Sequence, residues 1–174
     1  VEALNRLGAR IGYLENEGFP PLEIYGSRLV GGSIDIPASV SSQYISALLM
    51  IAPYMEKGLE IRLTGKVVSS SYIDMTLQIM REFGAEVGRE DTVIGVKPGE
   101  NRSVPYRVES DWSAASYFYE LLAIAGEGEI ILTGLKEKSM QGDSRQTVVW
   151  RKLGVRTCYE GDLVRLSAAK PEID

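Results

Sequence analysis

The stretches SQYISALLMIA (residues 42–52) and ASYFYELLAIA (residues 115–125) align with each other at an offset of 73 residues. EIRLTG (residues 60–65) and EIILTG (residues 129–134) align in the same order at an offset of 69 residues. The chain therefore repeats itself with a period of about 70 residues, and each copy is expected to form the same supersecondary unit.

A glycine that follows a helical pattern marks the repeat a second time. It occurs in RLGARIGY (residues 6–13), EFGAEVGR (residues 82–89) and KLGVRTCY (residues 152–159). Glycine suits the left-handed position that ends a helix, and a short extended run follows it in each case. Residues 1–25 thus read as the end of an earlier unit, a helix end and a hairpin. Because the chain opens inside a helical pattern, we expect it to be a piece of a longer protein.

Each unit reads as strand, helix, strand, helix, strand, strand, which gives an α/β (α+β) fold of tandem βαβαββ units. Apolar residues recur at helical spacing in the helices, and strand–helix–strand crossovers imply parallel pairing of the strands they join. The first unit is expected at residues 32–37, 41–53, 59–64, 72–83, 85–88 and 92–97. The second is expected at residues 104–109, 113–125, 128–133, 143–153, 155–159 and 162–167.

The composition of the 174 residues is that of a soluble globular protein, with 44% hydrophobic and 25% charged residues. No apolar run is long enough for a membrane span, and a net charge of −5 argues against broad nucleic-acid binding. Cys158 is the only cysteine, which fits a reducing compartment, and we expect the cytoplasm. There is no histidine, so acid–base chemistry is left to carboxylates, lysine or tyrosine.

Two helix starts in the first unit are rich in serine, SVSSQ (residues 39–43) and VVSSSYID (residues 67–74). A helix N-terminus presents unpaired N–H groups that attract phosphate, and serine hydroxyls add donors. Serine is also a common N-cap, so the capping interpretation stays open beside the anion site. The equivalent starts of the second unit, residues 111–116 and 139–145, carry carboxylates that would repel phosphate. The sequence therefore places any phosphate on the first unit.

Other candidate residues have simpler interpretations. Tyr72 could stack on a ligand ring or cover the core, and Asp111 is expected to cap the helix that follows it. Trp112 and Trp150 read as packing residues, and Cys158 has no plausible base beside it in the sequence. No stretch has the spacing of a P-loop, a dinucleotide-binding fingerprint or a zinc site.

In combination, five stretches resemble the family of 5-enolpyruvylshikimate-3-phosphate (EPSP) synthase, 3-phosphoshikimate 1-carboxyvinyltransferase. They are YLENEGFPPLEI, GGSIDIPASVSSQYISALLMIAP, VSSSYIDMTL, DWSAASY and LTGLKEKSMQGD, in order over nearly the whole chain. The resemblance implies the two-lobe enolpyruvyl transferase fold, with three βαβαββ units in each lobe and the active site between the lobes. Residues 1–108 would then belong to the first lobe, with one whole unit at about 32–97. Residues 109–174 would begin the second lobe, whose unit spans about 104–167.

The resemblance also implies an activity, the transfer of the carboxyvinyl group of phosphoenolpyruvate to the 5-hydroxyl of shikimate 3-phosphate. This is a shikimate-pathway step toward chorismate and the aromatic amino acids, and it needs no metal or other cofactor. Ser41, Ser42 and Ser69 would hold the 3-phosphate, Tyr72 would flank the shikimate ring, and Gln43 would reach both substrates. The family's acid–base and cationic residues match no position here, so we expect no catalytic residue in this chain and no turnover by it alone. The full-length enzyme is expected to be monomeric, and the isolated chain to self-associate.

Three alternatives remain at this stage. The related enolpyruvyl transferase that acts on UDP-N-acetylglucosamine shares the fold, although nothing here resembles its cysteine-bearing loop. A non-catalytic binding module of two units is a different class of function. A domain of a larger multifunctional shikimate-pathway polypeptide is the third.

Overall fold

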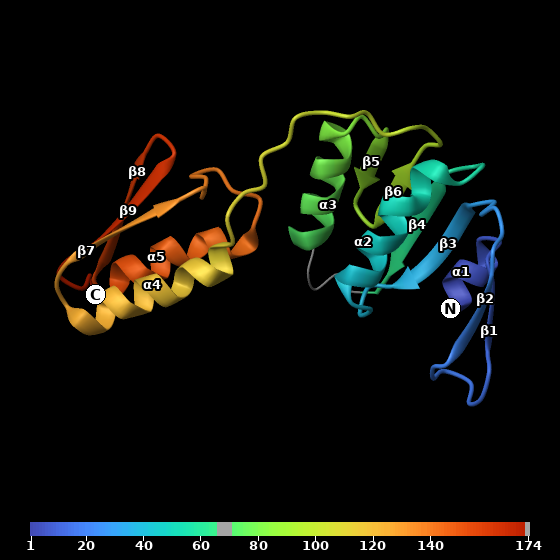
Figure 1. Cartoon of the computed structure of the whole chain (residues 1–174), viewed down its shortest axis with the longest axis horizontal. Helices are drawn as coiled ribbons and strands as arrows, with labels where there is room; N and C mark the ends of the chain where they lie inside the picture. Colours follow the sequence, from blue (N-terminus) through green and yellow to red (C-terminus); the bar gives the residue numbers. More distant parts are fainter. Residues whose placement is uncertain (66–70, 173–174) are drawn as a thin grey trace. The chain divides into compact units, whose positions relative to one another are not determined.

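The computed structural model describes residues 1–65 and 71–172, which form two compact units, Val1–Val104 and Pro105–Asp174 (Figure 1). The first unit opens with α1 (Glu2–Arg6) and an antiparallel hairpin of β1 (Arg10–Tyr13) and β2 (Leu22–Tyr25). This is the helix end and hairpin that the sequence predicts for residues 1–25. Gly8, at the end of α1, has a φ of 105°, which is the left-handed conformation expected there.

A four-stranded sheet in the order β3-β4-β6-β5 forms the body of the first unit. Its strands are β3 (Gly32–Pro37), β4 (Leu59–Thr64), β5 (Val87–Glu90) and β6 (Val93–Val96). β3 and β4 are parallel, as the crossover between them predicts, and the other pairs are antiparallel. The helices are α2 (Ser42–Ile51), continued by the short η1 (Ala52–Tyr54), and α3 (Ser71–Glu82).

Alternation along the strands gives the sheet one apolar and one polar face. Ile34 and Ile36 of β3 are buried, whereas Ser33 and Asp35, which alternate with them, are exposed. The buried residues of the strands form one core with those of α2 and α3; they include Leu59, Ile61, Leu63, Ile94, Ile45, Leu49, Ile73 and Leu77. The two helices therefore cover the apolar face and are held by it.

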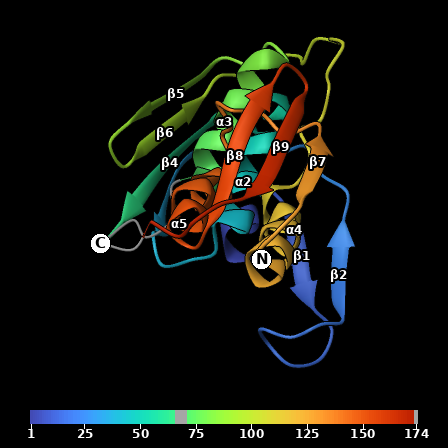
Figure 2. The ribbon, with the colours of Figure 1, turned by 90° about the vertical axis from the view of Figure 1, so that its left-hand side faces the viewer.

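The second unit holds α4 (Trp112–Ala125), β7 (Glu129–Thr133), the short η2 (Gly142–Arg145), α5 (Gln146–Lys152), β8 (Val155–Glu160) and β9 (Leu163–Ala168). Its three strands run antiparallel in the order β7-β9-β8, and both helices contact this sheet (Figure 2). Trp112, Tyr119 and Leu122 of α4 form a separate core with Val155, Val164 and Leu166. Gly84 and Gly154, which end α3 and α5, both have a φ of 87°.

One predicted strand is wrong. Residues 104–109 form no strand, so the second unit lacks the expected parallel pair with β7. Pro105 has no N–H to offer a ladder, and Val108 is 78% exposed, so pairing there would gain little burial. The predicted helix at residues 143–153 is also divided, because η2 precedes α5.

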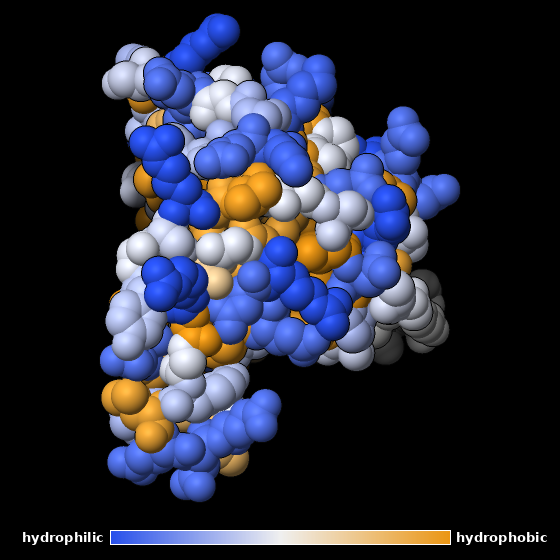
Figure 3. Space-filling model, turned by 90° about the vertical axis from the view of Figure 1, so that its right-hand side faces the viewer, coloured by the Kyte–Doolittle hydropathy of each residue, from blue (hydrophilic) through white to orange (hydrophobic). Residues whose placement is uncertain are grey.

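The surface mixes hydrophilic and hydrophobic residues, as Figure 3 shows for one face of the molecule. α4 carries a row of exposed apolar residues, with Tyr117 72%, Leu121 59% and Ile124 78% exposed. No helix within residues 1–65 and 71–172 combines the length and the apolar character needed to cross a membrane.

Candidate functional site: two parallel helix starts

α2 and α3 lie side by side and run in the same direction (Figure 1). The direction follows from the topology, because each helix comes directly after one of the two parallel strands, β3 and β4. Their N-termini therefore lie at the same end of the helix layer. α2 begins within the serine-rich stretch SVSSQ, and Ser71 of the second serine-rich stretch is the first residue of α3.

The start of α2 is held by a serine rather than by a charged side chain. Ser41 is the N-cap, and its Oγ accepts a hydrogen bond from the backbone N–H of Gln43 at 3.3 Å. This is long for an N–H···O bond, so the cap is weak. Ser41 and Gln43 are exposed and Ser42 is half-buried. Ser41 therefore caps the helix and is at the same time exposed to solvent.

At the start of α3, Tyr72 is 53% exposed and so does not cover the core. Of the two interpretations that the sequence leaves open for Tyr72, the structure contradicts the packing one. Ser71, the first residue of α3, is half-buried. Ser69, the remaining predicted phosphate contact, lies outside the described residues.

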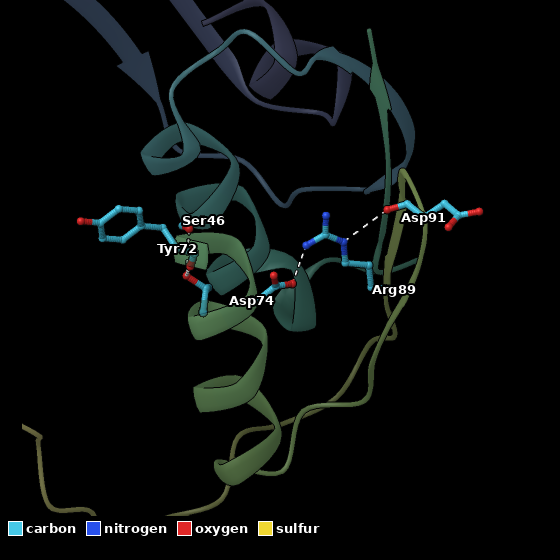
Figure 4. Close-up of polar contacts among 6 residues, drawn as sticks. Ser46, Tyr72, Asp74, Arg89 and Asp91 are labelled. Atoms are coloured by element: carbon cyan, nitrogen blue, oxygen red, sulfur yellow. Dashed lines mark hydrogen bonds and ion pairs between the residues drawn. The ribbon is translucent and has the colours of Figure 1, made fainter. Parts of the chain in front are cut away.

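A pair of hydroxyl groups joins the two helices near their starts (Figure 4). Ser46 Oγ of α2 and Thr76 Oγ1 of α3 lie 2.8 Å apart in a partly buried position. Thr76 Oγ1 also donates a hydrogen bond to the backbone carbonyl of Tyr72 at 2.9 Å. The contact therefore links α2 to the backbone of one of the predicted substrate residues.

The first turn of α3 carries one carboxylate, Asp74, which forms an ion pair with Arg89 of β5 (Figure 4). The Arg89 side chain is 19% exposed and that of Asp74 is 46% exposed. The Nε of Arg89 also donates to the backbone carbonyl of Asp91 at 3.3 Å. An unpaired carboxylate here would repel an anion at the helix start, and Arg89 offsets that charge.

In the second unit, protein acceptors occupy the start of α4. Asp111 is its N-cap, as predicted, and Oδ1 accepts from the N–H of Ser113 at 2.7 Å. The N–H of Trp112 donates to Gln141 Oε1 at 2.9 Å, and the hydroxyl of Ser113 donates to Asp143. Two carboxylates and an amide oxygen thus lie where the first unit presents serines, so this end of α4 is unsuited to phosphate.

The remaining sequence candidates are structural. Trp112 is fully buried and donates its indole N–H to Glu109 at 3.0 Å. Trp150 stacks on Tyr119 with ring centroids 5.8 Å apart. Trp112 lies in the core of the second unit and Trp150 packs against that core, so both are packing residues, as predicted. Cys158 is exposed on β8.

Sequence reasoning missed Ser46, Thr76 and Arg89. A usable signal exists for the first two, because Ser46 follows Ser42, and Thr76 follows Tyr72, at a spacing of i+4. That spacing places each on the same helix face as a predicted substrate residue. No local pattern marks Arg89, because its pairing with Asp74 depends on where β5 packs.

Comparisons with known proteins identify the family to which the chain is similar. A family model described as EPSP synthase (3-phosphoshikimate 1-carboxyvinyltransferase) matches residues 1–171. A 3-phosphoshikimate 1-carboxyvinyltransferase of Bacteroides fragilis is 52% identical over 167 residues, which are 95% of this chain and 41% of that protein. The Yersinia pestis protein of the same name is 42% identical over 170 residues, 96% of this chain and 39% of that protein. The chain thus spans about two fifths of the length of these curated relatives.

Among solved structures, an EPSP synthase from Acinetobacter baumannii matches with a TM-score of 0.70. The match covers 98% of this chain and 38% of that chain at 21% sequence identity. At this identity the match establishes the fold.

Proposed function

The chain belongs to the EPSP synthase family, whose model matches residues 1–171, and from this premise we propose that it supplies part of a carboxyvinyltransferase. The proposed reaction moves the carboxyvinyl group of phosphoenolpyruvate to the 5-hydroxyl of shikimate 3-phosphate and releases phosphate, on the route to aromatic amino acids. The names of the relatives favour this substrate over UDP-N-acetylglucosamine.

The first unit is proposed to hold the 3-phosphate of the shikimate substrate. One observation carries this proposal: the two parallel helices of this unit begin side by side, and the start of α2 presents serine hydroxyls where α4 presents carboxylates. Helix N-termini favour anions. A hydrogen bond to a charged group contributes about 1.5–3 kcal/mol. Ser41 and Ser42 would bind the phosphate from α2, and Ser69, outside the described residues, would bind it from the segment before α3.

Tyr72 and Gln43 are proposed to contact the rest of the substrates. The exposed ring of Tyr72 can lie against the shikimate ring without leaving the core open. The exposed amide of Gln43 offers both donors and an acceptor, so it can contact shikimate 3-phosphate and phosphoenolpyruvate together. Arg89 supports the binding of both anionic substrates, because it neutralises the Asp74 carboxylate in the first turn of α3.

The chemistry itself is proposed to depend on residues that this chain does not carry. Proton transfer and the clamping of phosphoenolpyruvate need acid–base and cationic groups around both substrates. The predicted substrate residues of this chain are hydroxyls, an amide and a phenol. We therefore assign no catalytic residue here, and expect the chain alone to bind shikimate 3-phosphate without turnover.

The wider assignments are also proposals. Residues 1–108 are assigned to one lobe and residues 109–174 to the start of the other, close to the division between the compact units at Val104 and Pro105.

The cytoplasm is the proposed compartment, and the unpaired Cys158 fits it. The exposed apolar row of α4 supports self-association of the isolated chain, which would appear as a concentration-dependent sedimentation coefficient. The full-length enzyme is proposed to be monomeric.

Calorimetric titration of the chain with shikimate 3-phosphate, and separately with shikimate, tests the proposed phosphate site. We expect saturable binding of the phosphorylated ligand, and much weaker binding of shikimate, which lacks the group that the serines hold. Ser41→Ala should weaken binding by roughly tenfold, the equivalent of one hydrogen bond to a charged group. Ser39→Ala, an exposed serine just before the cap, is the matched control and should bind as the wild type does. Equal binding of both ligands, or none of either, would contradict the proposal.

A further inference from the structure

The hydroxyl contact between α2 and α3 has a defined direction. A hydroxyl has one proton to donate, and Thr76 Oγ1 gives its proton to the backbone carbonyl of Tyr72. Thr76 must therefore accept in its 2.8 Å contact with Ser46, and Ser46 must donate. The result is a short chain of hydrogen bonds that runs from the Ser46 hydroxyl through Thr76 to the backbone of Tyr72.

This chain lies one helical turn beyond both proposed binding elements. Ser46 follows Ser42 by four residues in α2, and Thr76 follows Tyr72 by four residues in α3. Four residues rise about 6 Å along a helix, so the contact is at a similar depth below each start. A shift of one helix along the other would lengthen this contact and would move the serines of α2 relative to Tyr72.

The hydroxyl pair of Ser46 and Thr76 constrains the position of α2 along α3 in a way that the surrounding apolar packing does not. The neighbouring buried residues of the two helices, including Ile45, Leu49, Ile73 and Leu77, are apolar, and their contacts are not directional. A hydrogen bond is directional and weakens steeply when its geometry changes. The pair is partly buried, so separating its members also leaves polar groups poorly satisfied.

We infer that Ser46 and Thr76 are positioning residues, which fix the register of α2 against α3. In this register the residues at the two helix starts can bind the same ligand molecule; they are Ser41, Ser42, Gln43 and Tyr72. The inference rests on the proposed function, because it names shikimate 3-phosphate as that ligand. Neither residue touches the ligand; both act through the helix backbones.

A double-mutant cycle tests this role, with affinity for shikimate 3-phosphate measured by calorimetry and stability by urea unfolding. Ser46→Ala and Thr76→Val should each weaken binding by about fivefold, a loss of the size expected for one neutral hydrogen bond. The double variant should lose little more than either single one, because the two hydroxyls form one link. Thr76→Ser keeps the hydroxyl and should bind within about twofold of the wild type.

The second unit offers a matched control. Tyr119 Oη and Thr157 Oγ1 form a partly buried hydroxyl pair of the same length, 2.8 Å, between α4 and β8. Thr157→Val should lower stability as Thr76→Val does and leave the affinity unchanged. If the wild-type chain binds shikimate 3-phosphate and Thr76→Val binds it equally well, the positioning role is wrong, whereas the proposed function still holds. Absence of binding by the folded wild type would overturn both.

Discussion

At the scale of single residues, Ser41 combines two roles that one substitution can separate. Its hydroxyl caps α2 through the N–H of Gln43, and it is proposed to bind phosphate as well. Aspartate caps a helix as well as serine does, so Ser41→Asp should change the free energy of unfolding by less than about 0.5 kcal/mol. A negative charge a few ångströms from a doubly charged phosphate costs about 2 kcal/mol even at the dielectric constant of water.

We therefore expect Ser41→Asp to keep the stability of the chain and to lose more than tenfold in affinity for shikimate 3-phosphate. Urea unfolding and calorimetry measure the two quantities. Undiminished affinity in this variant would mean that Ser41 is only a cap.

At the scale of elements, the parallel pair β3 and β4 depends on a close approach of two glycines. Gly31, before β3, has a φ of 76°, and an ideal Cβ there would lie 2.0 Å from the carbonyl oxygen of Gly58. The next N–H, that of Gly32, donates to the same oxygen at 3.0 Å. The two strands that α2 and α3 follow are therefore brought together where no side chain fits.

Gly31→Ala should consequently destabilise the first unit by roughly 3 kcal/mol or more, because backbone must move to admit the methyl group. Gly18→Ala is the matched control, because Gly18 has a φ of 88° but its Cβ would meet nothing within 4 Å. It should cost only about 1–2 kcal/mol for the left-handed conformation. Equal losses of stability in urea unfolding would show that the close approach is unimportant.

Most elements could be predicted because the repeat and the glycines supply their order and their ends. β3 and β4 occur at the residues predicted, and the helices begin within a few residues of their predicted starts. The strand at residues 104–109 failed because a repeat gives the position of a segment and not its burial. Val108 has the residue type of a strand, but it is 78% exposed.

At the scale of the whole molecule, the two units have separate cores and should respond differently to alkali. Burial raises the pKa of Tyr119 to about 12 and also raises the pKa of Tyr159, and both tyrosines lie in the second unit. In the unfolded chain Tyr119 loses its proton near pH 10, whereas in the folded unit it keeps it up to about pH 12. The contribution of protonated Tyr119 to the free energy of unfolding is therefore fully present below pH 10, and it is lost as the pH rises toward 12.

The second unit should therefore lose about 2–3 kcal/mol of stability between roughly pH 10 and pH 12. Tryptophan fluorescence isolates it, because both tryptophans of the chain, Trp112 and Trp150, lie there. Tyr119→Phe should abolish most of the loss. An unchanged pH dependence in this variant would contradict the assignment to Tyr119.

Of the proposed substrate site, only the outer layer could be predicted from the sequence. The serine-rich helix starts indicate an anion site at residues such as Ser41 and Ser42, and the family resemblance implies Gln43 and Tyr72 as further substrate contacts. The layer beneath them, Ser46 with Thr76 and Asp74 with Arg89, depends on how α2, α3 and β5 pack against one another. Such pairs join residues that are distant in sequence, and no local pattern indicates the partner.

The central claim is that two helix starts of the first unit form one phosphate site, and amide NMR of the labelled chain tests it most directly. On titration with shikimate 3-phosphate, saturable shifts should occur together at residues 41–43 and at Tyr72, with one common dissociation constant. The start of α4, at Ser113, serves as the control within the molecule and should not shift, because Asp111 and Asp143 lie there. Shifts confined to one helix start, or shifts at Ser113 equal to those at Ser41, would contradict the account.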